Sequence, residues 1–139
     1  MKLTNQEVMN ALQSLKQIID IGFPISISYR LASLAQQLEN HSVVINRVVR
    51  ELRKKYGVKN KQGGFTVEPM IEIKKEDNET VLEPNPNFDL FQKDAEDLMP
   101  LEVEIIWAPV TLPLQVNGKS LDIKPSALVY LVDKFVLLE

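Results

Sequence analysis

The feature that most constrains the fold is an apolar repeat between residues 29 and 56. The repeat consists of Leu31, Leu38, Ile45 and Leu52 at intervals of seven, with Leu34, His41 and Val48 between them. This spacing places one apolar stripe along an amphipathic helix. At about 1.5 Å per residue the helix is on the order of 40 Å long. No shorter helix covers such a stripe alone, so we expect another part of the chain to pack on its far half.

A shorter helix precedes the long one. Thr4 and Glu7 have the spacing of a capping box, which predicts a helix start at Thr4. The Gly-Phe-Pro sequence at 22–24 ends this helix. Residues 25–28 alternate like a short extended segment, and the long helix is then predicted over 28–57.

The middle of the chain changes character after Gly57. A Gly-Gly pair at 63–64 predicts a flexible joint, and apolar residues at 70–73 and 81–82 predict two strands joined by a charged turn at 75–79. A short helix over 87–98 is expected to follow.

The last part of the chain combines strand, hairpin and helix signals. Residues 101–105 alternate like a half-buried strand, and Asn117-Gly118 is a strong type I′ hairpin signal. A helix is predicted from Pro125 to Glu139, apolar over almost its whole circumference. We expect it to pack on the far half of the long helix. The residues expected at this contact are Ile45, Val48, Val49 and Leu52 on one side and Leu128, Leu131, Val132 and Phe135 on the other.

These elements predict an α+β fold in a single domain, 1–139. Its parts are an N-terminal helical hairpin (1–57) packed with the C-terminal helix, a flexible or β insertion (58–86), and a helix, β-hairpin and C-terminal helix (87–139). Small antiparallel β elements are inserted between the helices. The length of 139 residues is enough to bury a core without disulfides or metal.

Composition excludes several kinds of chemistry. The chain has no cysteine and one histidine, His41, so thiol catalysis and thiolate metal sites are excluded. His41 falls at a position of the apolar stripe and is interpreted as a packing residue. We expect no cofactor and no metal. The first residues lack the apolar core of a signal peptide, and no apolar run approaches the roughly 20 residues of a membrane span. We expect a protein of the cytoplasm, with no membrane partner.

Charge is divided between the two halves of the chain. Residues 1–61 hold ten Lys and Arg against four Asp and Glu, and residues 62–139 hold six against fifteen. Such a division suits either self-association or a charged partner.

The first candidate binding surface is a basic patch at the end of the long helix. It comprises Arg47, Arg50, Arg53, Lys54 and Lys55. The patch could contact phosphates or an acidic protein. Nucleic acid is the less favoured ligand, because no aromatic residue interleaves the basic ones. The second choice is an acidic strand face formed by Glu102 and Glu104.

A nuclease-like pattern is also present. Glu72 and Lys74 form a Glu-x-Lys motif, with Glu68 upstream and a second carboxylate-x-Lys at Asp122 and Lys124. Two acids that hold Mg²⁺ beside a lysine would suit phosphodiester cleavage. The pattern is too common to be specific, and alternation along a strand explains it equally well. We therefore expect no enzymatic activity.

Several short motifs resemble a family of small uncharacterised proteins encoded by tailed bacteriophages and prophages. They are Met1-Lys2-Leu3-Thr4-Asn5, the run from Phe23 to Ala32, Arg53-Lys54-Lys55-Tyr56-Gly57, the run from Asp97 to Ile105, and the run from Pro125 to Glu139. Residues 64–86 and 107–121 depart from the family pattern. The family has no established activity, so the resemblance implies a viral setting and no mechanism.

These observations favour a non-catalytic phage protein that binds a macromolecular partner in the host cytoplasm. The favoured partner is a host protein that it modulates or inhibits, and the chain could also form a homo-oligomer. The alternative is a virion, tail-accessory or assembly protein. A small metal-dependent nuclease or a nucleic-acid binder is the third possibility.

Overall fold

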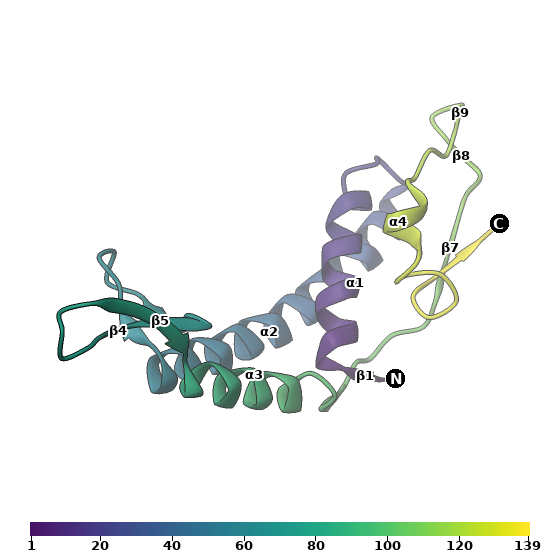
Figure 1. Ribbon diagram of the computed structural model, residues 1–139. Helices are drawn as coiled ribbons and strands as arrows, with labels where there is room; N and C mark the ends of the chain where they lie inside the picture. Colours follow the sequence, from purple (N-terminus) through teal and green to yellow (C-terminus); the bar gives the residue numbers. More distant parts are fainter. The chain divides into compact units, whose positions relative to one another are not determined.

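The computed structural model describes all residues, 1–139, and has the predicted α+β class. Figure 1 shows the elements in chain order. The helices are α1 (Asn5–Ile18), α2 (Ile25–Tyr56), α3 (Pro86–Leu98) and α4 (Pro125–Leu128). The strands are β1 (Lys2–Thr4), β2 (Val58–Lys59), β3 (Phe65–Thr66), β4 (Met70–Lys74), β5 (Thr80–Pro84), β6 (Glu102–Glu104), β7 (Val110–Leu112), β8 (Gln115–Val116), β9 (Lys119–Ser120) and β10 (Val136–Leu138).

The strands form five separate two-stranded sheets. The antiparallel pairs are β1–β6, β2–β3, β4–β5 and β8–β9, and β7 pairs in parallel with β10. An isolated two-stranded sheet is only marginally stable in water. The helices and the side chains packed on them must therefore supply most of the stability.

The chain divides into two compact units. The core unit comprises Met1–Val43 and Leu101–Glu139, and the inserted unit comprises Val44–Pro100. All buried apolar side chains except Ile45 lie in the core unit. The inserted unit consists of the last part of α2, two β-hairpins and α3, and most of its apolar side chains are only half-buried.

Helix α1 begins as the sequence predicts. The Thr4 hydroxyl accepts a hydrogen bond from the Glu7 backbone N–H, and the Glu7 carboxylate accepts one from the Thr4 backbone N–H, both at 3.1 Å. This reciprocal pair is the predicted capping box. The apolar face of α1, including Val8 and Leu15, is fully buried.

Helix α2 is present but begins earlier than expected. Residues 25–28, predicted to be extended, form its first turn, because the N–H groups of Ile27 and Ser28 donate to the carbonyl of Pro24. The Ser28 hydroxyl also donates to the carbonyl of Phe23, at 2.9 Å. The alternation of apolar and polar residues at 25–28 was therefore misleading. The helix ends at Tyr56, next to the predicted stop at Gly57.

The apolar stripe of α2 is buried along its first part only. Its buried members are Leu31, Leu34, Leu38 and Ile45. His41 is half-buried within this stretch, Leu52 is half-buried beyond it, and Val48 is 37% exposed. The ammonium nitrogen of Lys16 on α1 lies 3.4 Å from a carboxylate oxygen of Glu39 on α2. Packing of the two helices as a hairpin stays a prediction.

The predicted C-terminal helix is wrong beyond its first turn. Helix α4 covers only Pro125–Leu128, Asp133 adopts a left-handed conformation (φ 73°), and Val136–Leu138 forms β10. The segment is rich in β-branched valine, which favours strands, and its apolar character does not distinguish a buried strand from a buried helix. The expected burial of this segment nevertheless holds for Leu131 and Phe135, which are 0% and 1% exposed, whereas Leu128 and Val132 are half-buried.

The chain end packs within the core unit. Helix α4 lies against α1, and β10 pairs in register with β7, Val136 opposite Val110. The contact expected for this segment was with the far half of α2, which belongs to the inserted unit, and this contact stays a prediction. Val48 of α2 remains partly exposed, and Val49 and Leu52 are half-buried.

The predicted turns are confirmed. Asn117 and Gly118 join β8 to β9 with φ values of 54° and 77°, the two positive angles that a type I′ turn requires. The β4–β5 hairpin and helix α3 also occur where the sequence predicts them. None of the helices combines the length and the apolar composition needed to cross a membrane.

Candidate binding site at the basic end of α2

The five predicted basic residues all lie on the exposed surface of the last turns of α2. We call Arg47, Arg50, Arg53, Lys54 and Lys55 the basic end. None of them forms an ion pair; the ion pairs of the structure join Met1 to Glu104, Lys16 to Glu39 and Lys134 to Glu7. Cations near a helix C-terminus interact favourably with the helix dipole, which accounts for some of this charge. The cluster nevertheless leaves several unneutralised cations on one short segment.

A pocket of about 460 Å³ lies beside the basic end, within the inserted unit. One wall comes from α2 and the other from the β2–β3 hairpin. The lining residues are Arg50, Glu51, Arg53, Lys54, Gly63, Gly64 and Phe65. The structure therefore brings three of the five basic-end residues together with Phe65, and leaves Arg47 and Lys55 outside the lining.

Gly57 sets the position of the hairpin that closes this pocket. Its N–H donates to the Arg53 carbonyl at 2.7 Å, which ends α2 directly before β2. A Cβ atom at residue 57 would collide with the backbone oxygens of Arg53 and Thr66. Only glycine allows β3 to approach the end of the helix this closely.

The loop of the β2–β3 hairpin is closed by hydrogen bonds to Asn60. The Asn60 side-chain oxygen accepts from the N–H groups of Gln62 and Gly64, both at 3.0 Å, and the Asn60 carbonyl accepts from Gly63 at 3.2 Å. Consecutive free N–H groups are what a phosphate-binding loop presents. The N–H groups of this Gly-Gly loop are already used, so it does not form such a site.

Phe65 is the pocket residue that sequence reasoning missed. The sequence suggested that no aromatic residue accompanies the basic ones, because Phe65 stands ten or more residues after Arg53 and Lys54. The hairpin folds it back onto α2, where it is half-buried. The Gly-Gly pair directly before Phe65 was the available signal for such a reversal.

Tyr56 connects the basic end to α3. Its hydroxyl donates to an Asp94 carboxylate oxygen at 2.7 Å, and the Lys55 ammonium lies 4.9 Å from its ring centroid. The last turn of α2 is therefore held from two directions within the inserted unit, by α3 and by the β2–β3 hairpin.

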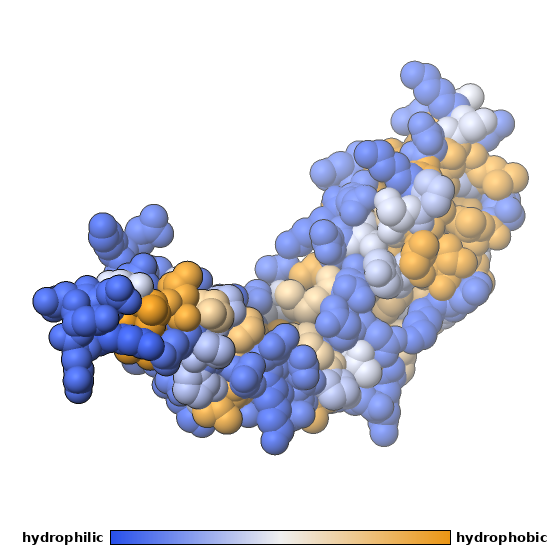
Figure 2. Space-filling view, in the orientation of Figure 1, coloured by the Kyte–Doolittle hydropathy of each residue, from blue (hydrophilic) through white to orange (hydrophobic).

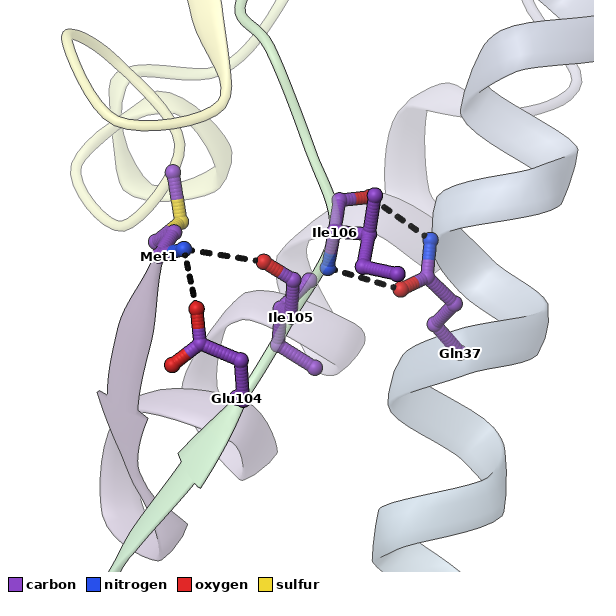
Figure 3. A network of polar contacts seen from close by, with 5 residues as sticks. All are labelled: Met1, Gln37, Glu104, Ile105 and Ile106. Atoms are coloured by element: carbon purple, nitrogen blue, oxygen red, sulfur yellow. Dashed lines mark hydrogen bonds and ion pairs between the residues drawn. The ribbon is translucent and has the colours of Figure 1, made fainter.

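The acidic strand face, the second predicted surface, is exposed but partly engaged. Glu102 and Glu104 both lie on β6 and are exposed. Figure 3 shows the Met1 amino group donating to Glu104 at 2.9 Å and to the Ile105 carbonyl at 3.0 Å. One of the two carboxylates is thus neutralised within the core unit, which makes this face the weaker candidate.

The residues of the nuclease-like pattern are divided between the two units. Glu72 and Lys74 are exposed on β4 of the inserted unit, whereas Asp122 and Lys124 are exposed in the core unit. The structure has no group of three or more acidic or histidine side chains arranged to hold a metal ion.

Glu7 has a pKa below its usual value. The Lys134 ammonium donates to its carboxylate and lowers the pKa of Glu7 below its usual value, and the hydrogen bond from the Thr4 backbone N–H lowers it further. Glu7 also lines a pocket of about 360 Å³ with residues 129, 130 and 132–135. Its carboxylate is thus committed to the α1 cap and to Lys134, which indicates a structural role.

Comparison of the chain with protein families, with curated proteins and with solved structures found no match. These comparisons do not test the resemblance to phage proteins, which stays a prediction.

Proposed function

We propose that this protein is a non-catalytic binding protein whose basic end contacts an acidic surface on another protein. The observation that carries the proposal is the exposed cluster of Arg47, Arg50, Arg53, Lys54 and Lys55, in which no side chain has an ion-pair partner. An acidic surface would supply the missing counter-charges and would guide the approach of the partner.

The inserted unit supports the same proposal by its lack of a buried core. Of its apolar side chains only Ile45 is buried, while Leu82 of β5 is 64% exposed and Met70 of β4 is 43% exposed. Figure 2 shows apolar side chains at the surface over the β4–β5 hairpin, among hydrophilic ones. Protein–protein interfaces combine apolar side chains with a polar rim, and the inserted unit presents both kinds of side chain at its surface.

Within the viral setting that the resemblance implies, the partner we favour is a host protein that the chain modulates or inhibits. A virion or assembly protein is the alternative. A map of the neighbouring genes would separate the two, because genes for structural proteins of a virus cluster together.

A charge-reversal experiment tests the proposed surface. The partner would first be identified by affinity capture from host lysate and then purified. Replacing both Arg50 and Arg53 by Glu should weaken binding, and added salt should weaken the wild-type complex, because exposed ion pairs are screened. Lys119→Glu, an exposed reversal in the core unit, is the control and should leave the affinity unchanged. If the double variant binds as tightly as wild type, the basic end is not the interface.

The second candidate function is single-stranded nucleic-acid binding, and Phe65 is the observation that favours it. An aromatic side chain beside cations can stack on a base while the cations contact phosphates. Glu51 in the same pocket and the net charge of −3 count against a polyanion. Binding of a fluorescent oligonucleotide, measured by anisotropy at two salt concentrations, separates this function from the first.

A further inference from the structure

The pocket beside the basic end offers two kinds of recognition within one site. Arg50, Arg53 and Lys54 are spaced three and four residues apart and share one face of α2. Phe65 of β3 lines the same pocket and supplies apolar surface. A ligand that fills this site needs at least one anionic group and one apolar group close together.

The anionic group must be recognised by side chains. The N–H groups of Gln62, Gly63 and Gly64 already donate to Asn60, so these three groups are not available to an anion. Arginine guanidinium groups bind planar carboxylates through paired hydrogen bonds. Two arginines and a lysine therefore suit carboxylates presented at intervals along a chain.

Glu51 argues against a continuous polyanion. Glu51 lines the pocket and follows Arg50 directly on the same turn of α2. Duplex DNA carries one negative charge per roughly 1.7 Å of helix axis, so some of its phosphates would meet Glu51. An acidic peptide can present an apolar or neutral residue there instead.

We propose that this pocket binds an extended acidic segment of the protein partner, with carboxylates on Arg50, Arg53 and Lys54 and an apolar side chain against Phe65. The inference rests on the proposed function, because it specifies which part of the basic end is used and what the partner presents. Recognition of acidic motifs by arginine clusters is a common mode of peptide binding.

The first experiment compares two variants of equal charge. The probe is a fluorescent peptide of alternating glutamate and leucine, titrated with the full-length protein and followed by anisotropy. Arg50→Glu with Arg53→Glu reverses two pocket cations, whereas Arg47→Glu with Lys55→Glu reverses two cations of the same cluster outside the pocket lining. The pocket pair should weaken binding about tenfold or more, and the outer pair about twofold.

The second experiment tests the apolar half of the site. Phe65→Ala should weaken binding of the leucine peptide but not of a peptide in which serine replaces leucine. The difference between the two losses of affinity measures the coupling between Phe65 and the leucine side chains. Phe65→Leu keeps apolar surface and should retain most of the affinity. Circular dichroism of each variant checks that the fold persists. A folded Phe65→Ala variant that binds the leucine peptide as tightly as wild type overturns the apolar contact.

The outcomes separate this inference from the proposed function. If the outer pair weakens binding as much as the pocket pair, the basic end is an interface but the pocket inference is wrong. If neither pair weakens binding, both are wrong. If a single-stranded oligonucleotide binds more tightly than the leucine peptide and loses affinity in the pocket pair, the pocket takes nucleic acid and the inference is overturned.

Discussion

The side chain of Gln37 binds the backbone of Ile106 through both of its amide atoms. Its amide nitrogen donates to the Ile106 carbonyl at 3.0 Å, and its amide oxygen accepts from the Ile106 N–H at 3.1 Å (Figure 3). The glutamine thus completes the hydrogen bonding of a residue just beyond β6, as a neighbouring strand would. Arg30 of the same helix donates to the Ala108 carbonyl at 2.7 Å and lies over the Trp107 ring. These contacts fix the β6–β7 connection on α2 within the core unit.

Replacing Gln37 by Ala should destabilise the core unit. The variant loses two hydrogen bonds at a partly solvated position, so we expect a loss of about 1 to 2 kcal/mol in the free energy of unfolding. Urea denaturation followed by circular dichroism measures it. Gln36→Ala is the matched control, because Gln36 bonds only to Asn40 on the same helix. Equal losses in the two variants would show that the contact with Ile106 is not stabilising.

Phe135→Ala should be among the most damaging substitutions in the chain. Phe135 is 1% exposed, and removing a buried aromatic side chain costs about 3 to 5 kcal/mol. The Trp107 indole donates to the Phe135 carbonyl at 3.0 Å, so tryptophan fluorescence reports directly on this region. Leu137→Ala, at a position that is 42% exposed, should cost far less. A cooperative unfolding transition unchanged in Phe135→Ala would contradict this account of the core.

The elements that local chemistry determines were predictable from the sequence. The Thr4–Glu7 cap, the Asn117-Gly118 turn and the end of α2 beside Gly57 depend on residues close together in the chain, and all three occur. The end of the chain was not predictable in this way. Val136–Leu138 becomes a strand because Val110–Leu112, which is distant in sequence, pairs with it.

The basic cluster was predictable, but its pocket was not. Arg50 and Arg53 share a helix face by spacing alone, and the structure finds both exposed. The contribution of Phe65 depends on the β2–β3 hairpin, whose strands have only two residues each and carry too weak a pattern to recognise. The close approach at Gly57 is likewise a tertiary property, which the sequence presents only as a helix stop.

The stability of the protein should depend on the ionisation of Glu7. Its pKa is lowered in the folded state, chiefly by Lys134, so ionised Glu7 stabilises the fold at pH values above the pKa that it has in the unfolded chain. This contribution is lost as the pH falls through the lower, folded-state pKa. The difference in unfolding free energy between wild type and Glu7→Gln should be at most about 1 kcal/mol at neutral pH, since the carboxylate is partly solvated. This difference should shrink as the pH falls below about 4.

Lys134→Met provides the control for this titration. It removes the ammonium group and should reduce the pH-dependent part of the difference, leaving the capping hydrogen bond with Thr4 in place. Chemical denaturation of the three proteins at several pH values measures the effect. A difference between wild type and Glu7→Gln that stays constant from neutral to acidic pH would show that Glu7 acts through its shape and not its charge.

Gly57→Ala should displace the β2–β3 hairpin without changing any charge. The new methyl group would meet the backbone oxygens of Arg53 and Thr66, and backbone atoms cannot rotate away as a side chain can. We expect the pairing of Val58 with Thr66 to be lost, with faster hydrogen exchange at both amides and a destabilisation of about 1 to 3 kcal/mol. Gly64→Ala is the control, because a methyl group there meets only the Asn60 side chain, at 3.5 Å. Gly57→Ala also tests the pocket. It should weaken binding of the glutamate–leucine peptide although Arg50, Arg53 and Lys54 are all retained. Unchanged exchange at Val58 and Thr66 would mean that the hairpin is not held at the end of α2 by this close approach.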